Sequence, residues 1–547
     1  MDQYAMDSSI NIISSESRWV ATVASIWIQA MTGWSYTFSI YSAAIKSSQS
    51  YDQSTLDTIS VFKDLGANFG VLSGLLYSAV SSVRNQRGGC CGSPWVVLVL
   101  GSAQCFLGYF LLWLSVVGVI DKPRVGFMCV FMLVAAHSQT FFNTANVVTA
   151  VQNFPEYSGT IVGIMKGFSG LSGAMLIQVH QAFFKGNPTT FILMLALLPS
   201  TLTLSLMCLV RISPQSRAND EKKYLNGFSI IALFLAAYMM IIIIFENIFN
   251  FPTWGRFFAL VGMLMLLSLP LKIAVEAISN DIITGTLHTE ESAFVLHSSN
   301  SIAPIKFMVH EEYQELPGSS IDRESVNVVE AMKRLDFWLL FAAMSCGMGS
   351  GLATINNMNQ IGQSFGFNIV QINTLVSLWS IWNFLGRFGA GYISDVLLHQ
   401  KEWPRPIMIA ITLAIMAGGH LTIATGLSGS LYIGTVVVGI CYGAQWSMMP
   451  TVTSEVFGVT HMGTIFNTIA IACPVGTYIL SVWVVGRLYD EKAEETESCL
   501  GVHCFRVSFF ILAFVSFLGF LFALSLYFRT RVFYRSVVMR RLQHSLE

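Results

Sequence analysis

Charged side chains are scarce in this sequence. Asp, Glu, Lys and Arg together make up 11% of the 547 residues, whereas hydrophobic residues make up 54%. A soluble domain carries about 25% charged residues, so this chain has too little polar material to cover a water-facing surface. The net charge of −1 also lacks the strong positive bias of a nucleic-acid-binding protein. We therefore expect a lipid bilayer, and no nucleic acid, around most of the chain.

Several sequence motifs are missing as well. No G-x-x-x-x-G-K-[ST] loop is present, which excludes nucleotide hydrolysis through a P-loop. The apolar segments contain no nucleophile–base pair and no metal-ligand spacing, so we expect no enzyme, no cofactor and no metal. No apolar run precedes Arg18, and the first apolar segment is expected to remain as a membrane anchor. No glycosylation sequon falls in an outside loop, so the sequence is equally compatible with the plasma membrane, the vacuolar membrane or another endomembrane.

The apolar residues are grouped in segments of about 20, which is the helix length that crosses a hydrocarbon core. The sequence therefore predicts an all-α integral membrane protein with about 14 transmembrane helices. Short polar loops separate most of these segments, and a longer polar stretch follows the eighth. The expected helices span roughly residues 19–41, 60–81, 95–119, 125–150, 159–183, 190–210, 225–248, 256–276, 335–361, 371–393, 406–427, 430–452, 462–486 and 506–528.

The expected helices fall into groups of six, two and six. We expect an N-terminal bundle at 19–210, a linker with two additional helices at 211–276, and a C-terminal bundle at 335–528. Roughly two thirds of the Lys and Arg residues fall in alternate loops on the side that also holds the two termini, 1–18 and 529–547. This bias predicts that both termini are cytoplasmic.

The polar segment 277–334 is cytoplasmic in this topology. It is rich in Ser, Glu, Asn and His. One interpretation is a solvated linker between the two bundles. The other is a regulatory segment that a kinase modifies or a partner protein binds.

The two groups of six contain matching motifs in the same order. The dipeptide Asn-Phe occurs at 68 and at 383, followed each time at the same spacings by Gly and Tyr. The tripeptide Gly-Thr-Ile opens the fifth helix of each group, at 159 and at 463. Gln139 and Gln445 lie at similar places in the two fourth helices. These matches predict a duplicated six-helix unit, which is how many transporter folds are built.

Two parts of the sequence resemble a known family. The segment 386–395, GRFGAGYISD, is similar to the signature loop between the second and third helices of a major facilitator superfamily half. The stretches 18–46 and 62–75 resemble the plant nodulin-like branch of that superfamily, which includes the nuclear-fusion-defective-type proteins. The resemblance runs along nearly the whole chain. It implies two six-helix bundles with two extra central helices, and secondary transport of a small molecule.

The signature segment is also a candidate conformational latch. Gly386, Gly389 and Gly391 are expected to let two helices approach closely. Asp395 lies at a cytoplasmic helix end, where it can pair with Arg387 or face the positive N-terminus of a neighbouring helix. The first half has Val80 at the equivalent position, so any latch of this kind rests on the second half.

Polar side chains inside membrane spans usually face a cavity or a partner. Lys166 is the most prominent, and is either an anion-binding cation or a side chain that extends to the cytoplasmic headgroups. For Asn356 the alternative to a binding role is a hydrated outer helix end. Deep carboxylates are nearly absent, so uniport or exchange fits as well as proton symport. The candidate substrate-binding residues are Lys166, Gln139, Asn143, Asn146, Gln29, Tyr36, Asn356 and Gln445.

Cysteines lie mostly within apolar segments and form no disulfide framework. Cys499 and Cys504 differ, because both lie in one polar loop on the expected outside. They can pair if that loop faces an oxidising compartment, and the sequence leaves this open.

Together these features predict a secondary active or facilitative carrier of a small solute. Lys166, with the resemblance of some relatives of this branch to oxalate/formate-type exchangers, favours a small organic anion. The alternative is a non-transporting membrane receptor or scaffold on a carrier fold, acting through the 277–334 segment.

Overall fold

The computed structural model describes residues 17–51, 53–87, 94–184, 187–213, 221–249, 252–298, 326–493 and 499–538. Within these ranges all regular secondary structure is helical, with short 3₁₀ or π segments labelled η. The first group of elements is α2 (Arg18–Gln29), η1 (Trp34–Thr37), α3 (Phe38–Gln49), α4 (Gln53–Asn68), α5 (Val71–Arg87), α6 (Trp95–Val117), α7 (Val125–Asn153), α8 (Ser158–Phe184), α9 (Pro188–Leu206) and η3 (Met207–Leu209).

Two helices follow, and then a second large group. The central pair is α10 (Glu221–Ile248) and α11 (Thr253–Ser298). The second group is α12 (Val328–Lys333), α13 (Leu335–Asn356), α14 (Met358–Ser364), α15 (Ile369–Lys401), α16 (Arg405–Thr425), α17 (Ser430–Phe457), α18 (Met462–Ala470), α19 (Ala472–Thr477), η4 (Tyr478–Gly486), α20 (Arg487–Ala493), α21 (His503–Phe533) and η5 (Tyr534–Val538).

Twelve helices in the described ranges are long and apolar enough to cross a membrane. The protein is therefore an integral multi-pass membrane protein. The expected helices at 19–41 and 371–393 are not among these twelve. The second of them corresponds to α15, which has ample length but carries Asn383, Arg387 and Asp395. The total of fourteen stays a prediction.

The first expected helix is interrupted rather than continuous. α2 ends at Gln29, and helical structure resumes as η1 and α3. At the interruption the backbone lies very close to α8, because a Cβ added to Gly33 would be 2.0 Å from Ser172 Oγ and 2.7 Å from the Ser169 carbonyl oxygen. Only glycine fits at such a contact, so the interruption keeps the first segment tightly against α8.

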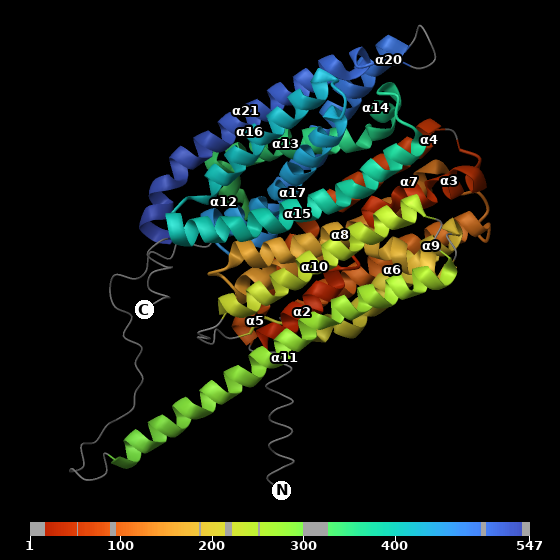
Figure 1. Cartoon of the computed structure of the whole chain (residues 1–547). Helices are drawn as coiled ribbons and strands as arrows, with labels where there is room; N and C mark the ends of the chain where they lie inside the picture. Colours follow the sequence, from red (N-terminus) through yellow and green to blue (C-terminus); the bar gives the residue numbers. More distant parts are fainter. Residues whose placement is uncertain are drawn as a thin grey trace.

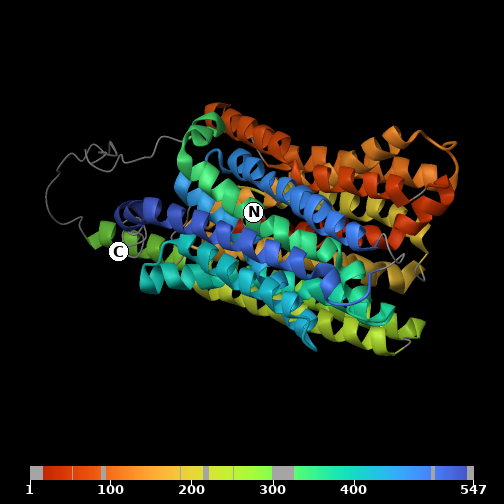
Figure 2. The same ribbon diagram turned by 90° about the horizontal axis from the view of Figure 1, so that it is seen from above.

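The long helices run roughly alongside one another, and α8 and α15 lie side by side where the two groups meet (Figure 1, Figure 2). α5 contacts α18 in the same way. The central pair packs outside this contact, with α10 against both α8 and α15, and α11 against α2 and α8. The two groups therefore meet mainly through these two helix pairs, and α10 touches both groups.

α11 extends well beyond the other helices (Figure 1). Its 46 residues include 277–298, the first part of the polar segment 277–334 that the sequence predicted to be a loop. No proline follows Pro270 until Pro304, so nothing in between removes a backbone donor and ends the helix. Residues 299–325 lie outside the described ranges, and the expectation for a regulatory segment there stays untested.

The glycines of the signature segment differ in their surroundings. A Cβ at Gly386 would lie 2.0 Å from the Ile440 carbonyl oxygen of α17, so this glycine does permit a close helix contact. A Cβ at Gly389 would meet no heavy atom within 4 Å. The expected packing role of Gly389 is therefore wrong, because this residue faces open space. The expected packing role of Gly391 is confirmed, with the Gly159 carbonyl oxygen 2.3 Å from its added Cβ.

Candidate functional site

A cavity of about 400 Å³ lies between the two helix groups. Its first wall comes from η1, α3, α4, α7 and α8, and its second from α13, α14, α15 and α17. Polar side chains dominate the first wall, among them Ser35, Ser60, Asn68, Gln139, Asn143, Lys166 and Ser169. Apolar and aromatic side chains dominate the second, among them Leu352, Ile355, Trp379, Tyr442 and Trp446.

Lys166 of α8 lines this cavity. Its side chain is buried, so it does not extend to the headgroups. The Nζ atom lies 3.5 Å from Asn143 Oδ1, and 5.5 and 5.4 Å from the ring centroids of Trp446 and Phe466. These partners are an amide oxygen and two aromatic rings, none of which neutralises the ammonium charge.

Arg387 of α15 lines the same cavity from the other helix group. Its Nε donates to Asn383 Oδ1 at 2.9 Å, and its Nη1 donates to the Lys166 carbonyl oxygen at 3.1 Å. Its guanidinium carbon lies 5.7 Å from the Trp446 ring centroid. The sequence assigned Arg387 to the latch, but the side chain turns toward the cavity because it lies two helical turns before Asp395.

The cavity is positively charged overall. Three basic residues line it, Lys63, Lys166 and Arg387, against one acidic residue, Asp64. Lys63 and Asp64 form an ion pair, with Nζ and Oδ1 3.0 Å apart. Because charge is strongly disfavoured in a low-dielectric interior, an excess of buried positive charge favours an anionic ligand.

Three of the predicted amides form one network beside Lys166. Gln139 Oε1 accepts a hydrogen bond from Ser35 Oγ at 2.5 Å. Asn143 donates to the Gln139 carbonyl oxygen at 3.1 Å, and its Oδ1 accepts from Gln29 Nε2 at 3.3 Å. Asn143 Oδ1 therefore faces both Gln29 and Lys166, and links the first helix to the cation.

The other predicted residues are placed differently. Asn356 lines the cavity, whereas Asn146 is fully buried away from it, and neither of its side-chain polar atoms has a hydrogen-bond partner in the described structure. Gln445 is buried within the second group, where its Nε2 lies 3.4 Å from Met416 Sδ. Tyr36 lies in η1, and its side chain is outside the described part of the chain.

Asp395 lies at the end of the contact between α8 and α15 that is expected to be cytoplasmic. It accepts hydrogen bonds from the backbone amides of Gly159 and Thr160, at 3.1 and 2.5 Å, at the N-terminus of α8. It also pairs with Arg405 Nη2 at 2.6 Å. Of the two partners expected for Asp395, the helix N-terminus is present, and Arg405 takes the place of Arg387. Arg405 in turn pairs with Glu455, so a buried charge network joins three helices.

A ring contact crosses the same interface. Tyr157, just before α8, stacks on His399 of α15 with ring centroids 5.3 Å apart. Burial raises the pKa of the Tyr157 hydroxyl, and the neighbouring Glu156, Glu221 and Asp395 raise it further. The phenol therefore stays neutral and adds to the closed contact without adding charge.

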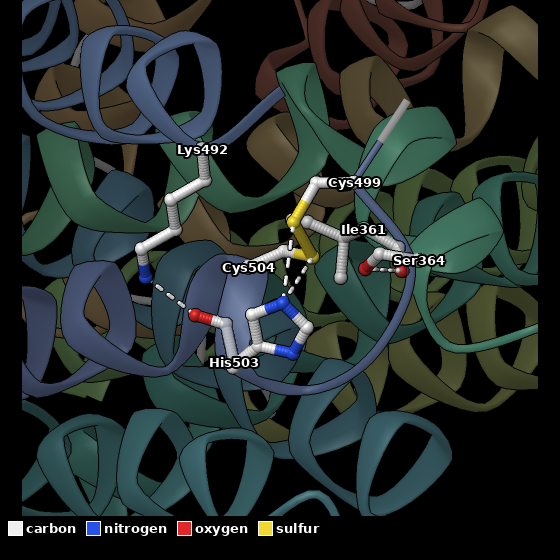
Figure 3. Close-up of a disulfide and its surroundings, with 6 residues drawn as sticks. All are labelled: Ile361, Ser364, Lys492, Cys499, His503 and Cys504. Carbon is white, nitrogen blue, oxygen red and sulfur yellow. Dashed lines mark hydrogen bonds between the residues drawn. A yellow bond between two sulfur atoms is a disulfide. The ribbon is translucent and has the colours of Figure 1, made fainter. Parts of the chain in front are cut away.

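A disulfide joins Cys499 to Cys504 (Figure 3). His503 lies beside it, with Nε2 3.7 and 4.0 Å from the two sulfurs, and Lys492 donates to the His503 carbonyl oxygen (Figure 3). The Gly501 amide donates to the Ser364 carbonyl oxygen at 2.8 Å, which ties this loop to α14. The pairing left open by the sequence is therefore present. The Cys–His–Cys group is close enough to hold a metal, but sulfurs bonded to each other are not thiolate ligands.

Two family models match most of the chain. The model described as Nodulin-like matches residues 18–275, and the NFD4 C-terminal domain matches residues 321–536. The chain belongs to the nodulin-like branch of the major facilitator superfamily. This nodulin-like protein is 26% identical over 550 residues to Protein NUCLEAR FUSION DEFECTIVE 4 of Arabidopsis thaliana, a match that covers 94% of this chain and 89% of the relative.

One further relative is named as a transporter, and two solved structures share the fold. The probable transporter MCH1 of Yarrowia lipolytica is 26% identical over 182 residues, covering 31% of this chain and 35% of that protein. The structure of the proton:xylose symporter XylE aligns with a TM-score of 0.53 at 11% identity, over 94% of this chain and 95% of XylE. The human organic anion transporter MFSD10 aligns with a TM-score of 0.50 at 11% identity, over 93% and 99%. The nodulin-like protein is therefore a membrane transporter.

Proposed function

We propose that this nodulin-like protein carries a small organic anion by alternating access, with the anion bound between Lys166 and Arg387. The observation that supports this most directly is that the two basic side chains belong to different helix groups and line one cavity. The Lys166 ammonium faces the Asn143 amide oxygen, and the Arg387 guanidinium donates to Asn383 and to the Lys166 carbonyl oxygen.

Arg387 and Lys166 are suited to different parts of anion binding. A guanidinium presents a planar fork of donors that matches the two oxygens of a carboxylate, and the Asn383 bond fixes its orientation. A lysine ammonium is a compact charge whose position Asn143 and two rings restrict. An anion held by both would join the two helix groups at the point where carriers of this architecture bind substrate.

The helix contacts that close one end of the cavity are consistent with the proposed alternating access. Beyond Lys166, α8 and α15 meet at Asp395, and α5 and α18 meet where Ser78 and Thr464 place their hydroxyls 3.2 Å apart. Both contacts lie at the expected cytoplasmic end. The cavity instead reaches the opposite end, where Leu56 and Asn359 line it. We propose that this is the outward-facing state, and that Gly386, Arg405 and Asp395 hold it closed toward the cytoplasm as a conformational latch.

The solved structures with this fold do not indicate one substrate class. One is described as a xylose symporter and another as an organic anion transporter, at the same low identity. The choice of an anion rests on the charge of this chain's own cavity.

The test is uptake into proteoliposomes that contain the purified full chain, against a panel of radiolabelled carboxylates, amino acids and sugars. Wild type, Lys166→Ala and Lys122→Ala are compared, the last being a matched lysine on an exposed loop. We expect saturable uptake of a carboxylate that Lys166→Ala reduces at least tenfold and Lys122→Ala leaves unchanged. Uptake of only neutral or cationic solutes, or carboxylate uptake unaffected by Lys166→Ala, would contradict the proposal. If no solute moves and deletion of 277–334 abolishes function in cells, the receptor alternative holds instead.

A further inference from the structure

The two walls of the cavity have different chemistry. The wall from the N-terminal group offers hydroxyls and amides, including Ser60, Gln139 and Asn143. The wall from the C-terminal group offers mainly rings and aliphatic side chains, and its polar members are Arg387, Asn356 and Asn359. A ligand that fits both walls needs one polar side and one broad apolar side.

The apolar wall contains a continuous row of rings. Trp379 of α15 and Tyr442 of α17 have ring centroids 6.0 Å apart, and Tyr442 and Trp446 have centroids 6.4 Å apart. Trp446 also lies beside both cations, with Lys166 Nζ 5.5 Å and Arg387 Cζ 5.7 Å from its centroid. The row therefore begins at the two positive charges and runs away from them along the cavity wall.

Trp446 provides a second, independent observation. Its indole Nε1 is buried and has no hydrogen-bond partner in the described structure. Buried N–H groups are almost always paired in folded proteins, so a buried indole donor at the edge of a cavity calls for an acceptor from outside the chain. An oxygen of a carboxylate held at Lys166 and Arg387 would supply that acceptor.

We propose that the transported anion is an amphipathic aromatic monocarboxylate. This rests on the proposed function. The carboxylate lies between Lys166 and Arg387 and accepts the Trp446 N–H, and the flat apolar body packs along Trp446, Tyr442 and Trp379. Offset or edge-to-face contacts with these rings favour an aromatic body. A small dicarboxylate such as oxalate has no apolar surface to place against this wall, and would leave the rings facing water.

The experiment is inhibition and direct uptake in wild-type proteoliposomes, which needs no variant. The probes are indole-3-acetate, indole-3-acetamide, acetate, succinate and oxalate. Indole-3-acetate keeps both the ring and the charge, the amide removes the charge, and acetate removes the ring. We expect indole-3-acetate to be carried with a KM at least tenfold lower than that of acetate, succinate or oxalate, and the amide to be inactive.

Variants then separate the parts of the site. Trp446→Phe keeps a ring and removes the N–H, and we expect it to raise the KM for indole-3-acetate several-fold. Trp379→Leu removes a ring, and we expect it to reduce the preference for indole-3-acetate over acetate at least fivefold. Trp254→Leu is the matched control, because Trp254 is 68% exposed on α11, away from the cavity. Trp254→Leu should change neither value.

The outcomes distinguish this inference from the function beneath it. Carriage of succinate or oxalate with a KM equal to or below that of indole-3-acetate overturns the aromatic substrate class and leaves anion transport standing. Loss of ring preference in Trp254→Leu to the same extent as in Trp379→Leu also overturns it. Failure of every carboxylate to move overturns the proposed function itself.

Discussion

The Asp395 carboxylate lies 2.6 Å from the Arg405 guanidinium, and both side chains are almost fully buried. The same carboxylate accepts two amides at the N-terminus of α8, where the helix dipole favours negative charge. One acidic group thus joins the expected cytoplasmic ends of the two helix groups. Bonds of this strength stabilise the state that contains them, and in the proposed transport cycle they must break when the protein opens toward the expected cytoplasmic side.

Replacing Asp395 by Asn should therefore open the cytoplasmic contact. The neutral amide keeps the size, but it loses the ion pair and at least one acceptor. Breaking a buried pair costs about 3–5 kcal/mol when a charge is left behind, and the remaining pair of Arg405 with Glu455 should keep the loss near the lower end. The measurement is thiol labelling of Ser78→Cys at the neighbouring α5–α18 contact, with Cys90, Cys91 and Cys208 replaced by Ser. We expect faster labelling in Asp395→Asn.

Asp121→Asn provides the control for this experiment. Asp121 is an exposed acid on the loop after α6. Equal labelling rates in Asp395→Asn and Asp121→Asn would show that Asp395 does not hold the contact closed.

Asn143→Ala should weaken substrate binding more than turnover. Asn143 Oδ1 is the hydrogen-bonding partner of the Lys166 ammonium, and it also holds Gln29. Without it the ammonium is less well positioned, and one lost charge-assisted hydrogen bond corresponds to about 1.5–3 kcal/mol. We expect the KM for the transported anion to rise by roughly ten- to a hundredfold with a smaller change in kcat. Asn226→Ala, on α10 outside the cavity, is the control. A change in kcat alone would argue that Asn143 acts on the conformational step.

Helical periodicity was sufficient to identify part of the site. Gln139 and Asn143 are four residues apart on one helix, so their shared face could be predicted, and α7 places both at the cavity. The same periodicity suggested Asn146, which lies beyond the cavity wall. Periodicity gives the direction of a side chain around its helix, but the depth at which the cavity ends depends on the opposing helices.

The remaining residues of the site depend on contacts between the two helix groups. Arg387 looked like a latch residue because it belongs to the signature segment, yet it reaches the Lys166 carbonyl oxygen of α8. Arg405 looked like an ordinary cytoplasmic arginine, yet it pairs with Asp395. The repeat predicted that Gln445 would lie where Gln139 does in the first half. Gln445 instead packs against Gly347, and a Cβ added to Gly347 would lie 2.3 Å from Gln445 Oε1. No pattern within one helix specifies these neighbours.

Removing the disulfide should lower stability and leave transport intact. The bond closes a loop of six residues, and loop-closure entropy predicts a loss of about 2 kcal/mol. We expect Cys499→Ser to lower the unfolding temperature in detergent, and a reductant to lower that of wild type by the same amount. Cys208→Ser is the control, since Cys208 is exposed and free. No shift with reductant would mean that the two thiols are not joined in the folded protein.

The central helix pair should prove to be an integral part of the N-terminal bundle, because Glu221 at the start of α10 pairs with Arg18 at the start of α2. Arg18 also lies over the rings of Trp19 and Phe154, so its guanidinium is largely shielded from water. Glu221→Gln leaves the Arg18 guanidinium buried without its carboxylate partner, and we expect a loss of about 3 kcal/mol in the free energy of unfolding. Arg18→Met with Glu221→Leu removes both charges and should recover most of it. Lys222→Gln, the exposed neighbour, is the control. A double variant no more stable than Glu221→Gln would contradict the pairing, since both would then act through something other than an uncompensated charge.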